Sequence, residues 1–307
     1  MRIAVTGGSG QLGTLILQRL AGLEEVTEVI ALDLQPPRVS SGKLREVRAD
    51  VRDPGLAQHF EGCDAVLHLA FLVARRGRRS LQDDVNVRGS ANVFDAALQA
   101  GVRRILYASS VAAYGVVPGL PVPVVETTER TRQPGFWYAC AKFDVEARLD
   151  QLEAVHPDLS VARFRPAILI GRRMENQLGA AMRRGYFPDG GSMPVVWDED
   201  VADAFVLALR SGARGAFILA AEEPLSAAAL ARAAGLRRLP VPRRLLRAVE
   251  AVATGLRLLA PSDPGWLEAA DFPLVYSPAK ARAELGWRPR APTAREVMRL
   301  YAAGRAA

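Results

Sequence analysis

Short runs of β-branched and other apolar residues alternate with longer stretches of helical period through the first half of the chain. The apolar runs predict strands, and the stretches between them predict helices. This alternation is typical of βαβ units, in which a parallel sheet is covered by helices. The predicted strands are Arg2–Thr6, Glu28–Leu32, Leu44–Ala49, Ala65–Leu69, Arg104–Ala108 and Ser160–Arg165, and the predicted helices are 11–22, 54–61, 82–100 and 137–155.

The pattern changes after Arg165. Gly and Pro recur every few residues at 171–194, and the last part, 225–307, reads as nearly all helical with Pro breaks. Other predicted features are a loop over the carboxyl edge of the sheet at 115–135, a helix at Asp198–Leu209 and a further strand at Gly215–Ala220. We therefore expect an α/β domain at 1–166 and a smaller, mostly helical part at 167–307, with 198–220 returning to the first sheet.

Composition places the chain among globular proteins and excludes disorder as its main state. Of its 307 residues, 50% are apolar and 24% are charged, and the net charge is +7. Three of the 40 basic residues are lysines (Lys43, Lys142 and Lys280), so 37 are arginines, most of them at helical spacing and often near an acid. This distribution argues against a nucleic-acid-binding patch.

The remaining compositional signals exclude several classes. Cys63, Cys140 and the three histidines have no metal-ligand spacing, so neither a disulfide scaffold nor a metal site is expected. No run of about 18 uncharged apolar residues occurs, which argues against membrane insertion. The first residues enter a strand without a leader pattern, and we expect a cytoplasmic protein.

A glycine-rich loop follows the first predicted strand. Thr6–Gly13 reads Thr-Gly-Gly-Ser-Gly-Gln-Leu-Gly and opens a helix. Glycines there allow a sharp turn and a close approach of backbone N–H groups to a pyrophosphate, so Gly7, Gly10, Gln11, Leu12 and Gly13 are candidate dinucleotide ligands. Asp33 ends the second strand 20 residues after Gly13, where an acid binds ribose hydroxyls and favours NAD. Arg38 keeps NADP as an alternative.

Tyr138 and Lys142 lie four residues apart on a predicted helix and therefore share one face. A phenol has a pKa near 10 and becomes a useful base only when a nearby cation stabilises the phenolate. Ser110 follows a predicted central strand, where open α/β sheets place their chemistry. These three residues are the candidate catalytic and substrate-orienting groups. Without the glycine loop, the pair would read as an ordinary surface contact.

Taken together, the motifs resemble the extended short-chain dehydrogenase/reductase family, in its NAD-dependent epimerase/dehydratase group. The resemblance implies a Rossmann-type, doubly wound α/β fold, in which 1–166 is an NAD(P)-binding domain and the smaller, mostly helical part at 167–307 binds substrate. The matching segments are Thr6–Gly13, Asp33, Asp50-Val51 with Asp53, His68–Ala70, Asn86–Gly89, Ser109–Gly115, Tyr138–Lys142, Arg165-Pro166, Asp200–Ala202 and Ser277–Trp287.

The resemblance also implies roles for single residues. Lys142 is expected to hold the nicotinamide ribose, and the further cofactor contacts are Asp50, Val51, Leu69, Ala70, Asn86, Ser109 and Pro166. For Asn86, helix packing is an equal alternative to cofactor contact, and His68 is expected to be a packed strand residue. A homodimer through the helices near 82–100 and 137–155 is also implied.

Departures from the family bear on the substrate. Ile168 stands where sugar-nucleotide 4-epimerases commonly have Asn, and Met193–Val196 stands where an Arg usually clamps the substrate diphosphate. The late Arg-Pro-Gly-Asp motif is replaced by Asp263–Trp266, and Val111-Ala112 replaces the acid pair of the 4,6-dehydratases. We therefore expect neither the usual diphosphate clamp nor that elimination route.

Two sequence features are left with two interpretations each. The first is a set of arginines that either bind an anionic substrate, with Arg172 as the candidate, or are solvated: Arg75–Arg79, Arg172-Arg173 and Arg183-Arg184. The apolar helical stripe from Leu245 to Leu259 predicts a lid or core helix, with a membrane-surface helix as the alternative.

The resemblance implies hydride transfer between NAD and a carbinol or carbonyl carbon. Tyr138 would be the general acid/base, Lys142 the group that tunes its pKa, and Ser110 the hydroxyl that aligns the substrate oxygen. We expect a small sugar-like substrate and epimerisation. The alternatives are a ketone or aldehyde reductase or alcohol dehydrogenase acting on a non-nucleotide substrate, and a non-catalytic dinucleotide sensor, which would have no need of a phenolate.

Overall fold

The computed structural model describes residues 1–73, 78–172, 191–236 and 272–306, with the side chains of 305–306 left out, and seven isolated positions: Leu245, Ala248, Val252, Leu256, Asp263, Gly265 and Ala269. Its centre is a parallel sheet of seven strands in the order β10-β6-β5-β4-β1-β2-β3. The strands are β1 (Arg2–Thr6), β2 (Glu28–Asp33), β3 (Leu44–Arg48), β4 (Ala65–His68), β5 (Arg104–Ala108), β6 (Ser160–Pro166) and β10 (Gly215–Leu219). The strand order reverses between β1 and β4, and such a switch point leaves a crevice at the carboxyl ends of the strands.

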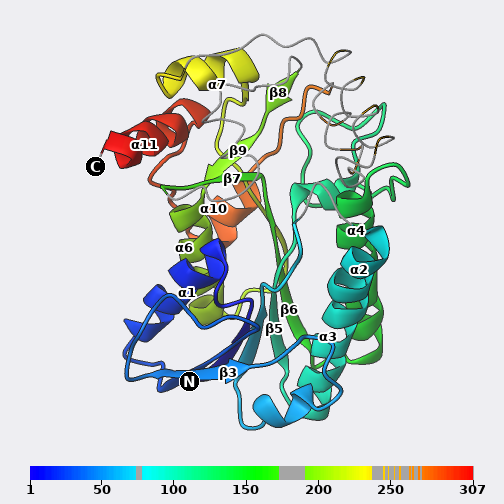
Figure 1. The fold of residues 1–307 in the computed structure, drawn as a ribbon, viewed down its shortest axis with the longest axis vertical. Coiled ribbons are helices and arrows are strands. Elements are labelled where there is room, and N and C mark those ends of the chain that lie inside the picture. Colours follow the sequence, from blue (N-terminus) through cyan, green and yellow to red (C-terminus); the bar gives the residue numbers. More distant parts are fainter. Residues whose placement is uncertain are drawn as a thin grey trace.

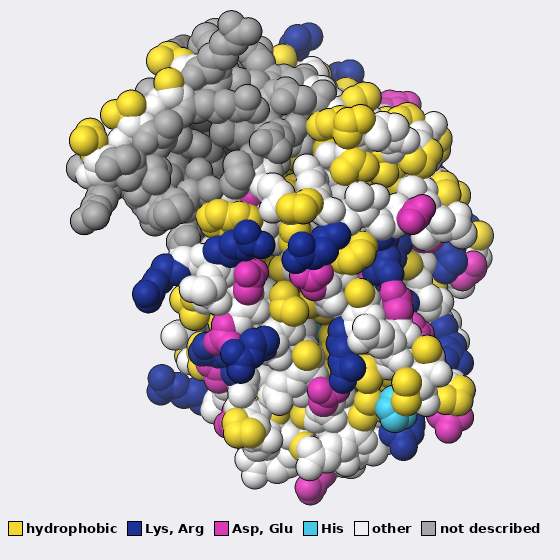
Figure 2. All heavy atoms as spheres, turned by 90° about the vertical axis from the view of Figure 1, so that its right-hand side faces the viewer, with side chains coloured by type: hydrophobic (Ala, Val, Ile, Leu, Met, Phe, Trp, Pro, Cys, Tyr) yellow, Lys and Arg dark blue, Asp and Glu magenta, His cyan; other side chains and the backbone are white. Residues whose placement is uncertain are grey.

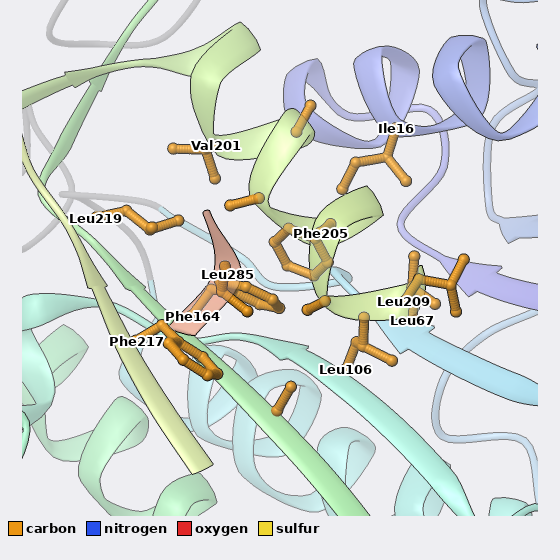
Figure 3. Close-up of a cluster of buried hydrophobic side chains, with 14 of the residues drawn as sticks. Ile16, Leu67, Leu106, Phe164, Val201, Phe205, Leu209, Phe217, Leu219 and Leu285 are labelled. Atoms are coloured by element: carbon orange, nitrogen blue, oxygen red, sulfur yellow. The ribbon is translucent and has the colours of Figure 1, made fainter. Parts of the chain in front are cut away.

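Helices cover both faces of this sheet (Figure 1). On one face, α1 (Gln11–Ala21), α6 (Asp198–Ser211) and α10 (Ala279–Leu285) pack over the strands. The centre of this layer is aromatic: the rings of Phe164 on β6 and Phe205 on α6 lie 4.0 Å apart between their centroids (Figure 3). The expected doubly wound α/β fold is therefore confirmed.

The other face is covered by α3 (Gly89–Gln99) and α4 (Trp137–Val155), which bury residues such as Phe94 and Leu149. The single helix predicted at 82–100 is three elements: α2 (Arg79–Asp83), a π-helical turn at Asp84–Arg88 and α3. Gly89 starts α3 against the segment after β3, where a Cβ would lie 2.7 Å from Val51 Cγ2. The helix predicted at 54–61 is only a 3₁₀ turn, Leu56–His59, and Gly62, with a φ of +69°, turns the chain three residues later.

A smaller layer lies beyond the carboxyl edge of the main sheet (Figure 1). It contains two two-stranded sheets, one parallel and one antiparallel, around a core that includes Trp197, Leu230 and Met298. Its elements are β7 (Ile168–Ile170), β8 (Ser192–Met193), β9 (Val195–Trp197), β11 (Leu225–Ser226), α7 (Ala227–Ala233) and α11 (Ala294–Ala306). The described part of 225–307 is thus less uniformly helical than predicted, since 272–278 forms no helix.

Charged side chains are interspersed on the face that carries α2 and α4 (Figure 2). Arginines there lie beside acids, as in the pairs Arg148–Asp95, Arg132–Asp144 and Arg79–Asp83. This arrangement agrees with the interpretation that the arginine content is spread over the surface in ion pairs.

Candidate active site

The glycine loop packs directly against the end of β4. Gly7 has a φ of +77°, and a Cβ on it would lie 2.5 Å from the backbone nitrogen of Ala70. A Cβ on Gly13 would lie 2.2 Å from the carbonyl oxygen of Gly7. The N-terminus of α1 has neither a side-chain cap nor an acid in its first turn. Its backbone N–H groups therefore suit an anionic group such as a pyrophosphate.

Replacing Gly13→Ala is expected to weaken NAD binding by at least about ten-fold and to destabilise the fold by roughly 1–3 kcal/mol, because the added methyl group must push the loop backbone away. Calorimetric titration with NAD and thermal unfolding measure the two effects. Gly42→Ala is the matched control, since nothing lies within 4 Å of a Cβ at that position. Wild-type affinity in the Gly13 variant would show that the tight loop geometry is not needed for binding.

Asp33 faces this loop from the end of β2. One of its carboxylate oxygens, Oδ2, accepts a hydrogen bond of 3.0 Å from the backbone N–H of Ser9, and Oδ1 accepts one of 3.2 Å from that of Gln35. The structure thus places the acid beside the loop, as a ribose-binding role requires.

Two other candidate cofactor contacts, Asp50 and Asn86, form hydrogen bonds to neighbouring protein groups. Asp50 is held by Arg52 through both carboxylate oxygens, at 2.9 and 2.6 Å, and Arg52 lowers the pKa of Asp50. Asn86 is buried, and its amide accepts from Leu72 N at 2.7 Å and donates to Leu72 O at 3.1 Å. Asn86 therefore fixes the segment after β4, and direct cofactor contact by Asn86 stays a prediction.

Tyr138 and Ser110 meet at the carboxyl edge of the sheet. Ser110 follows β5 and caps the 3₁₀ turn Val111–Tyr114, its Oγ accepting from Ala112 N at 3.2 Å. Burial raises the pKa of Tyr138 to about 12, and a hydrogen bond from Ser110 opposes that shift. The phenol therefore carries its proton at neutral pH, ready to donate it to a substrate oxygen.

Lys142 is buried one turn further along α4. Its Nζ donates to Ala108 O at 2.7 Å and to the Tyr107 hydroxyl at 3.2 Å. The same nitrogen lies 3.5 Å from the ring centroid of Phe71 and 5.9 Å from that of Tyr138. Burial lowers the pKa of Lys142 well below its usual value. Stabilisation of the Tyr138 phenolate by Lys142 stays a prediction, since the pKa of Tyr138 is raised here.

A buried ion-pair network, which the sequence patterns did not reveal, underlies these residues. Glu146 accepts from Arg165 at 2.9 and 2.5 Å, from Arg130 at 2.9 Å and from Ser109 Oγ at 2.5 Å. Arg165 also donates to the Tyr114 hydroxyl at 2.6 Å. Burial by itself raises the pKa of Glu146, but the arginines outweigh it and the net shift is downward. Ser109 therefore contacts this network, while its predicted cofactor contact stays a prediction.

His68 is packed inside the sheet, as predicted. Its two ring nitrogens lie 2.7 Å from Thr6 Oγ1 and 2.8 Å from Ser90 Oγ. Burial lowers the pKa of His68 to about 3, so the ring is neutral at physiological pH. Among the described residues, no three His, Cys, Asp or Glu side chains form a metal site.

The predicted substrate residues are only partly described. Arg172 pairs with Glu199 at 3.2 Å and lies 6.0 Å from the ring centroid of Trp197. Ile168 pairs with Val195 between β7 and β9, so the two segments in which we expected no diphosphate clamp form an apolar pair of strands. Two other predicted features lie largely outside the described residues. They are the remaining arginine clusters, at Arg75, Arg76 and 173–184, and most of the apolar helical stripe at 245–259. None of the described helices combines the length and the apolar composition that a membrane span requires.

Comparisons with known proteins agree with this geometry. A family model described as the NAD dependent epimerase/dehydratase family matches residues 3–219. An uncharacterized protein of Mycobacterium bovis is 27% identical over 303 residues, which cover 94% of this chain and 80% of that protein. The UDP-glucose 4-epimerase of Mycolicibacterium smegmatis is 29% identical over 237 residues, which cover 68% of this chain and 73% of that protein. The structure of MoeE5 in complex with UDP-glucuronic acid and NAD superposes with a TM-score of 0.77 at 22% identity, and the match covers 100% of this chain and 99% of MoeE5. This similarity shows the fold alone.

Proposed function

Because the chain belongs to the NAD dependent epimerase/dehydratase family, we propose that it moves hydride between NAD and a carbinol or carbonyl carbon of a sugar-like substrate. The observation that carries this proposal is that Tyr138 and Ser110 meet at the carboxyl edge of the sheet, the same edge at which the glycine loop leaves β1. The family supports an enzymatic role and NAD as cofactor.

The residues fit the cofactor. Gly7 and Gly13 allow a tight loop, because neither position has space for a Cβ, and this loop leaves room for the pyrophosphate. The uncapped N-terminus of α1 provides N–H donors for it. Asp33 would hold the adenosine ribose, and Leu69, Ala70 and Pro166 would line the cofactor. When bound, NAD accepts or supplies the hydride at the nicotinamide ring.

Proton transfer is the part played by the chain itself. The Tyr138 hydroxyl gives its proton to the substrate oxygen as a carbonyl is reduced, and recovers it when a carbinol is oxidised. When substrate is bound, the single hydroxyl proton of Ser110 would turn from the Tyr138 oxygen to the substrate oxygen and keep that oxygen in line with the phenol. Lys142 would hold the nicotinamide ribose, and its positive charge would favour the phenolate during oxidation.

Epimerisation requires that hydride return to the opposite face of the same carbon, whereas a reductase or dehydrogenase releases its product after one transfer. The curated UDP-glucose 4-epimerase relative supports the first reading. The apolar Ile168–Val195 pair supports the alternative, a ketone or aldehyde reductase or alcohol dehydrogenase acting on a non-nucleotide substrate.

Both functions can be tested with a panel of UDP-glucose, UDP-galactose, free sugars and small ketones. Each reaction is monitored by the absorbance of the nicotinamide and by the configuration of the product. Inversion without net NADH indicates an epimerase, and stoichiometric NADH change indicates a reductase or dehydrogenase. A protein that binds NAD and turns over none of the panel favours the sensor alternative.

We expect NAD to bind more tightly than NADP by at least about ten-fold, since the Asp33 carboxylate repels a 2′-phosphate. Asp33→Asn is expected to narrow this ratio, and Asp158→Asn, which changes an exposed acid beyond the C-terminal end of α4, is expected to leave it unchanged. Titration with each dinucleotide measures the ratio. Tighter binding of NADP by the wild type would refute the role of Asp33.

We also propose a cytoplasmic homodimer that associates through α3 and α4. The exposed faces of these helices carry the ion pair Arg148–Asp95. Sedimentation of the purified chain measures the assembly state.

A further inference from the structure

We propose that Asp263 is a positioning residue for catalysis, which fixes the first turn of α4 and thereby the location of Tyr138. The proposal rests on the proposed function, because it assigns significance to the position of that phenol. Asp263 lies 125 residues after Tyr138 in the sequence. It belongs to the part of the chain expected to bind substrate, not to the nucleotide-binding sheet.

The first observation is a cap supplied from outside the helix. The residue that precedes α4, Phe136, makes no side-chain cap hydrogen bond. The Asp263 carboxylate takes that place: Oδ1 accepts from Trp137 N at 3.1 Å, and Oδ2 accepts from Tyr138 N at 3.0 Å. Only 1% of Asp263 is exposed to solvent. Two helix N–H groups that would otherwise lack an intrahelical partner are thus satisfied by one buried carboxylate.

The second observation is the close approach of Gly265, two residues after Asp263, to the first turn of α4. Gly265 donates its N–H to Asp263 Oδ1 at 3.1 Å, which fixes the carboxylate. A Cβ on Gly265 would lie 2.2 Å from Cγ of Phe136, so only glycine fits against that ring. Ala269 and Phe272 pack on the same buried cluster as Phe136. Asp263 is therefore held in its position by packing as well as by hydrogen bonds.

These contacts bear on catalysis because Asp263 bonds the main chain of Tyr138 itself. The Tyr138 side chain is oriented by aromatic neighbours, with ring centroids 5.7 Å from Phe71 and 6.1 Å from Phe136. The position of its Cα is fixed by the first turn of α4, which Asp263 caps. A displacement of about 1 Å between reacting groups lowers the rate by up to roughly 100-fold. Loss of the cap should therefore lower kcat while NAD binding is retained.

Hydrogen exchange of the backbone amides tests the contact without any substrate. In the full-length chain, Asp263→Ala should make the Trp137 and Tyr138 amides exchange at least about ten-fold faster, because both lose their acceptor. Asp263→Asn, which keeps the shape of the side chain, should give a smaller increase. Asp158→Asn, the exposed acid used above, should leave both amides unchanged. Unchanged exchange of the two amides in Asp263→Ala would overturn the proposal.

Kinetics then separates a positioning role from a merely structural one. With any panel compound that the wild type accepts, Asp263→Asn should lower kcat by at least about ten-fold with KM and the Kd for NAD nearly unchanged. Faster exchange with unchanged kcat would make Asp263 a structural cap only and would overturn its positioning role. The Tyr138→Phe variant, assayed beside it, separates the two claims: if that variant is active, the proposed function is wrong, whatever Asp263 does.

Discussion

Tyr138→Phe is expected to lower turnover by roughly 10²–10⁴-fold, the range for loss of a general acid or base. The expected loss lies in kcat, because the phenol gives its proton to the substrate oxygen only as the reaction proceeds. The Kd for NAD should remain within about two-fold of the wild type, since no cofactor-binding role of the phenol is required. Steady-state kinetics with the compound identified in the panel and calorimetric NAD titration measure the two quantities.

The substitution is suited to this test because it removes one oxygen and keeps the ring. The ring packs against Phe71 and Phe136, and these contacts should persist in the variant. Tyr301→Phe, which removes a buried hydroxyl on α11, is the matched control and should retain turnover. Equal activity of the Tyr138 variant and the wild type would remove Tyr138 from the mechanism.

Glu146→Gln is expected to have the largest effect on stability, roughly 3–5 kcal/mol, which is typical of a buried ion pair with one partner removed. Neutralising Glu146 leaves Arg165 and Arg130 facing a side chain without charge, and Arg165 is only 4% exposed. Urea unfolding followed by circular dichroism measures the change. A pronounced loss of activity should accompany it, because Glu146 holds Ser109 next to Ser110 and Arg165 holds Tyr114 on the other side.

Asp150→Asn provides the control within the same network. Asp150 contacts Arg130 and Arg163, but its side chain is 46% exposed. Such an exposed partner contributes about 0–1 kcal/mol, because solvent screens its charge. If both variants were destabilised equally, burial of the Glu146 charge would not be the source of the effect.

The main fold could be predicted because its signals are local. Most strands of the seven-stranded sheet are short, largely apolar runs, although β3 at the sheet edge has three charged residues among its five. The glycine loop has a fixed spacing after β1. The helix at 82–100 was predicted as one element because its helical period is continuous, whereas the π-helical turn at Asp84–Arg88 reflects packing that the period does not encode.

The site was predictable only where a motif was contained in a short segment. Tyr138, Lys142 and Ser110 lie in such segments. Glu146 lies four residues after Lys142, and this helical spacing was a signal that could have been followed, but its partners Arg130 and Arg165 are brought to it by tertiary folding. Asp263 stood out in the sequence only as part of the segment that replaces the Arg-Pro-Gly-Asp motif. Its contact with Tyr138 spans 125 residues and has no local sequence pattern. Likewise, the bond from Lys142 to the Tyr107 hydroxyl depends on the packing of α4 over β5.

Transfer of an isotope label from the substrate to the nicotinamide would reveal the proposed hydride step itself. A substrate deuterated at the reacting carbinol carbon is incubated with NAD and the wild-type chain, and the nicotinamide is examined by mass spectrometry within the first turnover. Deuterium should appear on the reduced nicotinamide, at a rate that Tyr138→Phe lowers by at least about 100-fold. Turnover in which the deuterium never reaches the nicotinamide would contradict the proposed hydride step.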